Sequence, residues 1–240
     1  MAEACEKLRQ ELSAADQAKL CSHTLDISDA KSCANLAQFL KKEHGGIDVL
    51  VNNAGIAFKA RITNATNYFG LRNICDALFP LLRANGRVVN VESKGGIMKG
   101  RGYSEANEQL LKSPTLTIPQ IDAFVNTFIE HATRGDHVAA GYRDSAYGVS
   151  KAAGIALSVV QQRAFDGDKT RTGILVNAVR VSERCMNQII EIIIAVLPRL
   201  RGHGHDQSQG PVDNRSGRRN AGVVGHVADW CDESGGTVLF

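Results

Sequence analysis

Three short apolar runs constrain the fold of this chain more than any other feature, because each is continuous rather than alternating with polar residues. They are IDVLVNNAG at 47–55, GRVVNVES at 86–93 and ILVNAV at 174–179. Strands that are apolar on both faces are typical of parallel sheets covered by helices. The sequence therefore predicts an α/β fold built on a doubly wound parallel sheet.

Helical patterns fill the segments between these runs. Asp29 is a capping residue for a helix that reaches about His44, where two glycines end it. The other expected elements are helices over 2–18, 67–83 and 145–165 and a short strand over 20–27. Strand and helix patterns therefore alternate along the chain as far as about residue 179.

Composition excludes several classes of function. The 240 residues carry a formal net charge of +3, too small to indicate a nucleic-acid surface. The longest apolar run, 189–197, contains Glu191 and is far shorter than the roughly 20 residues of a membrane span. The amino terminus lacks the apolar core of a secretory signal, and the six cysteines form no C-x-x-C pair. We expect a cytoplasmic chain that binds neither nucleic acid nor membrane.

Polar residues follow the predicted strands at the edge where open α/β sheets bind ligands. Asn53–Gly55 and Ser93 end two strands, and Tyr147 and Lys151 begin a helix with a spacing that puts both on one face. Tyrosine, with a pKa of about 10, is a poor acid at neutral pH unless a nearby ammonium stabilises its phenolate. A serine hydroxyl can hold a carbonyl oxygen. The set indicates proton donation to a carbonyl during hydride transfer.

The order of these motifs resembles that of the short-chain dehydrogenase/reductase family, and within it the monomeric carbonyl reductases. The motifs are LDISD, DVLVNNAGIAF, TNYFG, RVVNVES, SAYGVSK and LVNA, and they cover roughly residues 4–179. The resemblance implies a Rossmann-like fold, NADPH as cofactor, and reduction of a small-molecule ketone, aldehyde or quinone.

The same resemblance implies residue roles. Ser93, Tyr147 and Lys151 align with the catalytic residues of the family, and Asn67 aligns with a residue that anchors a proton-relay water. The implied cofactor-binding residues are Asp26, near the adenine ring, and Asn53, Ala54, Gly55, Tyr147 and Lys151. No metal is expected, because the His203, His205 and Asp206 cluster belongs to no predicted element.

An insertion separates two of the site residues. Tyr147 follows Ser93 by 54 positions, far more than in most members of the family. We expect a helix within about 104–135 that packs on the body of the fold, with Thr117 and Gln120 in capping-box spacing. In carbonyl reductases this insertion covers the surface that other members use to oligomerise, so the resemblance implies a monomer.

The sequence departs from the family at its first unit. The glycine-rich phosphate turn and the first βαβ unit do not occur in it. In such sheets the missing strands lie between the strand at 20–27 and that at 47–53, so the latter either gains a new partner or keeps an open edge. The segment between NNAGIAF and TNYFG, which precedes Asn67, is also shorter than in the family. Glu92 replaces a small residue and is expected beside the Ser93 hydroxyl or in solvent.

The carboxyl-terminal part departs most. We expect a partial family domain over 1–179 and a divergent, poorly ordered tail over 180–240. Back-translating 198–229 with freely chosen permitted codons and reading one base later can give a segment with TDM and GAETPV in the family's order. The hypothesis is that residues from about 198 onward are translated in the wrong reading frame from the sequence that encodes a carbonyl-reductase tail. Residues from about 180 to 197 would then be translated from intron-like sequence.

Two functions stay open on the sequence alone. The first is an NADPH-dependent carbonyl reductase in which Tyr147 donates the proton. The alternative is a non-catalytic, truncated member of the same family that binds weakly or interacts with a partner, or a defective gene product that does not fold stably. The catalytic residues are retained while the phosphate turn is not, so cofactor binding is the property that separates the two.

Overall fold

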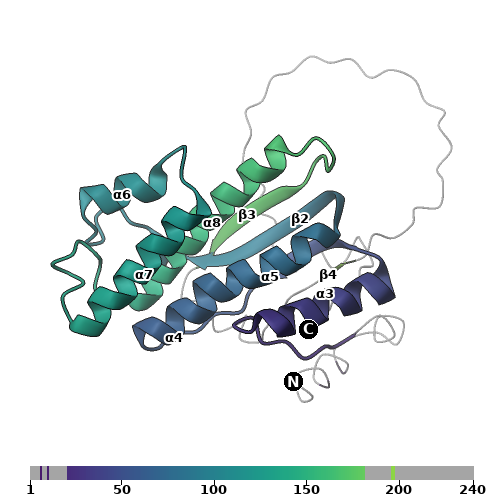
Figure 1. The fold of residues 1–240 in the computed structure, drawn as a ribbon, viewed down its shortest axis with the longest axis horizontal. Helices are drawn as coiled ribbons and strands as arrows, with labels where there is room; N and C mark the ends of the chain where they lie inside the picture. Colours follow the sequence, from purple (N-terminus) through teal and green to yellow (C-terminus); the bar gives the residue numbers. More distant parts are fainter. Residues whose placement is uncertain (1–5, 7–9, 11–20, 182–195, 198–240) are drawn as a thin grey trace, which may run out of the picture.

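The computed structural model describes residues 21–181 together with Glu6, Gln10 and residues 196–197. This part of the chain forms one sheet with helices packed against it (Figure 1). The helix predicted over 2–18 lies outside the described residues, except that Glu6 and Gln10 are helical. The predicted tail lies outside them too, apart from 180–181 and 196–197.

The three predicted strands form the parallel part of the sheet. They are β1 (Ile47–Asn52), β2 (Leu82–Ser93) and β3 (Leu175–Val181), and with β4 (Val196–Leu197) the order is β3-β2-β1-β4. The register places Val88 of β2 between Leu50 of β1 and Val176 of β3. The prediction of an α/β fold with an incomplete parallel sheet is confirmed.

The edge of β1 gains a new partner, which is one of the two outcomes expected for it. β4 pairs with β1 in the antiparallel direction, joining Val49 to Leu197 and Leu50 to Val196. The prediction of a strand over 20–27 is wrong for residues 22–27. In this segment of the described chain, only Cys21 forms a β-bridge. A strand needs partners for its N–H and C=O groups along its length. The parallel strands that would supply them are not in the described sheet.

One face of the sheet carries the main core. Leu50, Val88 and Val176 share a register row and pack with side chains from α3, α5 and α8. On the opposite face, Leu175 and Val179 of β3 are each 44% exposed. The helices are α3 (Ala30–His44), α4 (Ala60–Asn64), α5 (Leu71–Leu78), α6 (Glu105–Lys112), α7 (Ile118–Arg134) and α8 (Ala146–Gly167). Short helical turns lie at Phe79–Leu81 and Lys94–Gly96, and a π-helix at Ala65–Gly70 joins α4 to α5.

The insertion contains two helices where one was predicted. The segment between α6 and α7 includes Pro114, whose ring nitrogen cannot donate a helical hydrogen bond. At the start of α7 the Gln120 side chain accepts a hydrogen bond from the Thr117 backbone N–H at 2.9 Å. The apolar face of α7 is buried beside α8, as expected, through Ile121, Phe124, Val125 and Phe128.

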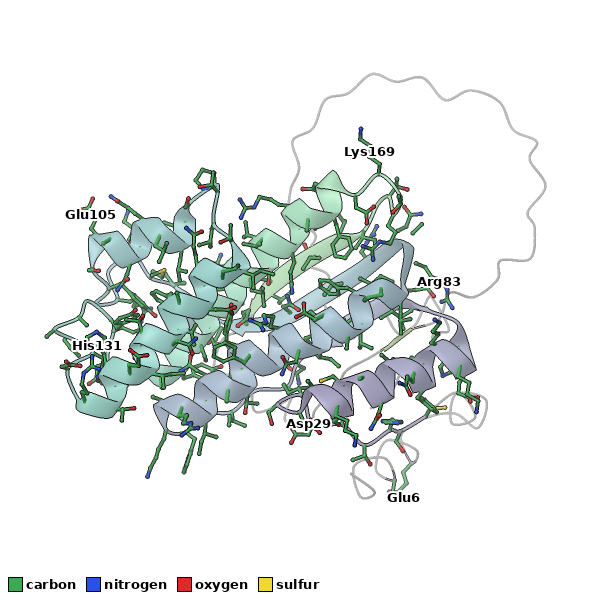
Figure 2. The ribbon with its side chains drawn as sticks, in the orientation of Figure 1. Glu6, Asp29, Arg83, Glu105, His131 and Lys169 are labelled. Carbon is green, nitrogen blue, oxygen red and sulfur yellow. The ribbon has the colours of Figure 1, made fainter. Side chains whose placement is uncertain are left out.

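The cap of α3 yields a prediction for stability. The Asp29 carboxylate accepts hydrogen bonds from the backbone N–H groups of Lys31 at 3.0 Å and Ser32 at 3.3 Å. Asp29 lies at the N-terminal end of α3 (Figure 2). Replacing Asp29 with alanine is expected to lower the free energy of unfolding by about 1 kcal/mol. Urea denaturation measures this. Asp29→Asn, which keeps the acceptor, should stay within a few tenths of a kcal/mol.

Candidate active site

Ser93 and Tyr147 lie on either side of one small residue at the carboxyl end of β2. Ser93 is the last residue of β2, and its buried hydroxyl accepts a hydrogen bond from the Gly95 N–H at 3.0 Å. A Cβ placed at Gly95 would lie 3.3 Å from Ser93 Oγ and 3.5 Å from two ring carbons of Tyr147. The Ser93 hydroxyl and the Tyr147 ring therefore border the same space beside Gly95. A side chain at position 95 would occupy part of this space.

The lysine of the motif lies one helical turn beyond the tyrosine, on the same side of α8. Lys151 Nζ is 5.8 Å from the centroid of the Tyr147 ring and donates a hydrogen bond to the Val91 carbonyl at 2.7 Å. Its side chain is only 7% exposed. The structure therefore brings Ser93, Tyr147 and Lys151 together, as the motif spacing suggested.

Asn67 fixes the turn that follows β1. It belongs to the π-helix, a form often found at functional positions, and its side chain is buried. Its Nδ2 donates to the Ile56 carbonyl at 2.8 Å and to Ser150 Oγ at 3.0 Å, and its Oδ1 accepts from the Ile56 N–H at 2.8 Å. A Cβ at Gly55 would lie 3.5 Å from Asn67 Oδ1 and 3.6 Å from Lys151 Nζ. The turn containing Asn53, Ala54 and Gly55 thus borders the lysine.

These contacts predict a measurable role for Asn67. Replacing Asn67 with alanine removes three hydrogen bonds and leaves the Ile56 backbone groups unpaired, so we expect a loss of about 2 kcal/mol in the free energy of unfolding. Chemical denaturation reports the loss. Asn64→Ala is the matched control, because the Asn64 amide donates only to the carbonyl of Ala60 in its own helix at 2.9 Å. An equal loss in both variants would contradict this role.

Asp26 lies apart from the other predicted site residues along the chain, before α3. Its exposed carboxylate accepts hydrogen bonds from the Ser28 N–H at 2.8 Å and the Ser28 hydroxyl at 2.7 Å. The hydrogen bond from the Ser28 hydroxyl is the main cause that lowers its pKa. These local bonds shape the turn before α3, and the described contacts do not join Asp26 to Ser93, Tyr147 or Lys151.

Glu92 occupies neither of the positions expected for it. It is 2% exposed and points under α8, with Oε2 3.4 Å from Lys151 Nζ. Side chains alternate along a strand, so Glu92 shares the helix-covered face with Val88 and Asn90 rather than with Ser93. Burial raises the pKa of Glu92 to about 7, and the charge of Lys151 opposes that rise. The site therefore holds a buried carboxyl group next to its lysine.

Two further sets of polar contacts were not found by sequence reasoning. The Arg143 guanidinium donates a hydrogen bond to the Gly95 carbonyl and so holds the residue between Ser93 and Tyr147. Asn52 Nδ2 donates to Asn90 Oδ1 at 2.8 Å, and Asn90 Nδ2 donates to Ser158 Oγ at 2.8 Å, which ties both strands to α8. The polar positions inside two otherwise apolar strands were the available signal for this second set.

The fold and these motifs are similar to those of the short-chain dehydrogenase family. The model of that family, described as short chain dehydrogenase, matches residues 1–105. Carbonyl reductase (NADPH) 1 of Homo sapiens is 40% identical over 166 residues, which cover 65% of this chain and 60% of that protein. Carbonyl reductase (NADPH) 3 of Rattus norvegicus is 39% identical over a region of the same length. The chain thus spans about 60% of the length of these relatives.

Solved structures show the same similarity. Menthone neomenthol reductase from Mentha piperita superposes with a TM-score of 0.67 at 25% identity, covering 75% of this chain and 76% of that chain. Salutaridine reductase from Papaver somniferum gives a TM-score of 0.66 at 25% identity, covering 75% and 73%. The predicted Rossmann-like class of the fold is therefore confirmed.

Among the described residues, none of the helices combines the length and the apolar character that crossing a membrane requires. Within the same part of the chain, the His, Cys, Asp and Glu side chains form no group of three that could hold a metal ion. The cluster of His203, His205 and Asp206 lies outside the described residues, so the expectation that no metal binds stays a prediction.

Proposed function

We propose that this chain reduces ketone, aldehyde or quinone carbonyls with NADPH, as the names of its carbonyl reductase relatives suggest. The observation that carries the proposal is the convergence of Ser93, Tyr147 and Lys151 at the carboxyl edge of β2. A hydroxyl, a phenol and an ammonium are the groups that carbonyl reduction needs around the oxygen that gains a proton.

The described residues around Lys151 fit the nicotinamide half of the cofactor. The small turn at Gly55 borders Lys151 Nζ and Asn67, and the phenol of Tyr147 lies beside the same lysine. Lys151 and Tyr147 would hold the ribose next to the nicotinamide, and the turn of Asn53, Ala54 and Gly55 would line it. NADPH, when bound, supplies the hydride. Asp26 is proposed to contact the adenine.

Each residue has a role in this proposal. Ser93 donates a hydrogen bond that orients the substrate carbonyl, and Tyr147 gives its phenolic proton to the carbonyl oxygen. Lys151 stabilises the phenolate that remains after the proton has left. Asn67 holds the turn after β1 and anchors the water that returns a proton to Tyr147.

A direct measurement tests the proposal. Purified protein is titrated with NADPH, nicotinamide fluorescence reports binding, and turnover of a simple quinone is followed by the loss of that fluorescence. Binding in the micromolar range together with turnover is the expected result. Protein that is folded by circular dichroism but neither binds NADPH nor reduces the quinone would overturn the proposal.

One observation favours the alternative, a non-catalytic family member. In doubly wound dinucleotide-binding sheets, the strand next to the counterpart of β1 runs parallel to it and leads into the glycine-rich phosphate turn. Here β4 pairs with β1 at Val49 and Leu50, and it runs antiparallel. A chain with this pairing would bind NADPH weakly while its Ser93, Tyr147 and Lys151 stay in place. The same titration separates the two functions.

We also propose a monomer in the cytoplasm whose binding partners are small carbonyl compounds, with neither nucleic acid nor membrane involved. The monomer is supported by α7, whose apolar face is already buried against its own chain. Light scattering coupled to size-exclusion chromatography tests it. A stable dimer at micromolar concentration would contradict the role given to the insertion.

A further inference from the structure

Glu92 fills a space that α8 leaves for it. The side chain of Glu92 is 1% exposed and is directed at Gly154, at the centre of α8. A Cβ at Gly154 would overlap Glu92 Oε1 and would lie 2.7 Å from its Cδ. Helix and carboxyl group therefore fit together only because residue 154 lacks a side chain. The packing of α8 against β2 therefore fixes the buried position of Glu92.

The carboxyl group competes for the ammonium of the catalytic motif. Lys151 Nζ lies 3.4 Å from Glu92 Oε2 and 2.7 Å from the Val91 carbonyl oxygen that it binds, and both acceptors are on β2. The Tyr147 ring centroid is 5.8 Å away. An ionised Glu92 would cancel much of the charge that Lys151 offers to a phenolate, because the pair lies in a buried, weakly screening environment.

We propose that Glu92 is the positioning residue of Lys151, retaining the ammonium beside β2 when it is ionised and releasing it toward Tyr147 when it is protonated. This inference rests on the proposed function for its catalytic consequence. Its structural part, the coupling between the Glu92 proton and the Lys151 side chain, does not.

The other groups around Glu92 leave Lys151 as its main charged partner. Cys75 of α5 faces the same interior, but burial raises the pKa of its thiol to about 12, so it stays neutral. Arg180, the register partner of Glu92 on β3, is exposed to solvent. Because the pKa of Glu92 is raised to about 7, its charge changes within the physiological range.

The expected catalytic signature is a loss of activity on the alkaline side of neutrality. The pH profile of kcat should fall as pH rises through about 7, because Glu92 ionises there and retains Lys151. Glu92→Gln, nearly isosteric and neutral, should abolish that fall. Glu130→Gln on the exposed face of α7 removes the same charge without touching the site and should keep the wild-type profile. A wild-type profile in Glu92→Gln would overturn the catalytic part.

A second readout needs neither cofactor nor turnover. In the ligand-free protein, carbon NMR of the Glu92 carboxyl and of Lys151 Cε should show both signals changing with one midpoint near pH 7. In Glu92→Gln the Lys151 transition should vanish, and in Lys151→Met the Glu92 midpoint should rise, because the ammonium lowers it. A Glu92 titration that leaves Lys151 unmoved would overturn the inference. Absence of turnover in every variant would instead contradict the proposed function, with the NMR result still deciding the coupling.

Discussion

Gly154→Ala is expected to lower the free energy of unfolding by about 3 kcal/mol, at the upper end of the cost of overpacking. In a helix interior this substitution ordinarily stabilises by about 1 kcal/mol, so the expected sign is opposite to that of helix propensity. The added methyl group would meet Oε1 and Cδ of Glu92, whose side chain is only 1% exposed. Glu92 has to leave its space, and its ion pair with Lys151 is lost with it.

The chain offers both a matched control and a rescue for this prediction. Gly167 ends the same helix with nothing within 4 Å of the position of its Cβ, so Gly167→Ala should be neutral or slightly stabilising. Shortening the opposing side chain, as in Glu92→Ser, should remove most of the cost of Gly154→Ala in a double-mutant cycle. Urea denaturation at fixed pH measures all four variants. A Gly154→Ala protein as stable as wild type would show that Glu92 does not fill this space.

The sequence was sufficient for the parts of the fold that rest on local pattern. The continuous apolar runs located β1, β2 and β3, because strands covered on both faces have no polar alternation. Asp29 located the start of α3, and Ser145 the start of α8, where its side chain accepts a hydrogen bond from the Gly148 N–H at 3.0 Å. The site followed from the same logic, since parallel strands end at one edge of the sheet.

Elements that depend on absent or distant neighbours could not be predicted. The segment after Cys21 has the composition of a strand but forms none, because a strand is completed by its partner rather than by its own residues. The pairing of Val196 and Leu197 with β1 joins residues nearly 150 positions apart, and two residues carry no periodic signal.

Glu92 shows where the prediction of the site failed for a different reason. Strand alternation places Glu92 on the same face as Val88 and Asn90. The sequence pattern was therefore sufficient to predict that its side chain faces the helices. What decides its burial is a missing side chain on α8, at Gly154, together with the ammonium of Lys151. That is complementarity between two elements, and a single sequence does not show it.

Tyr147→Phe is expected to reduce kcat for a simple quinone by about 10²- to 10⁴-fold, the range of one general-acid contribution. The substitution removes only the phenolic hydroxyl and keeps the ring beside Gly95 and above Lys151. Cofactor affinity should fall by only about tenfold, the effect of one lost hydrogen bond to the ribose, because the proton itself moves only in the chemical step. Stopped-flow turnover and fluorescence titration with NADPH separate the two quantities.

Tyr68 provides the control that distinguishes a lost proton donor from a lost structural hydroxyl. It is fully buried in the π-helix, and its hydroxyl donates to Asp122 Oδ1 at 2.8 Å, on α7. Tyr68→Phe should therefore cost about 1–2 kcal/mol of stability and leave kcat near the wild-type value. Tyr147→Phe should show the reverse pattern. If both variants lost stability while kcat of Tyr147→Phe stayed within a few-fold of wild type, another group would have to deliver the proton, and the role assigned to the Tyr147–Lys151 pair would be wrong.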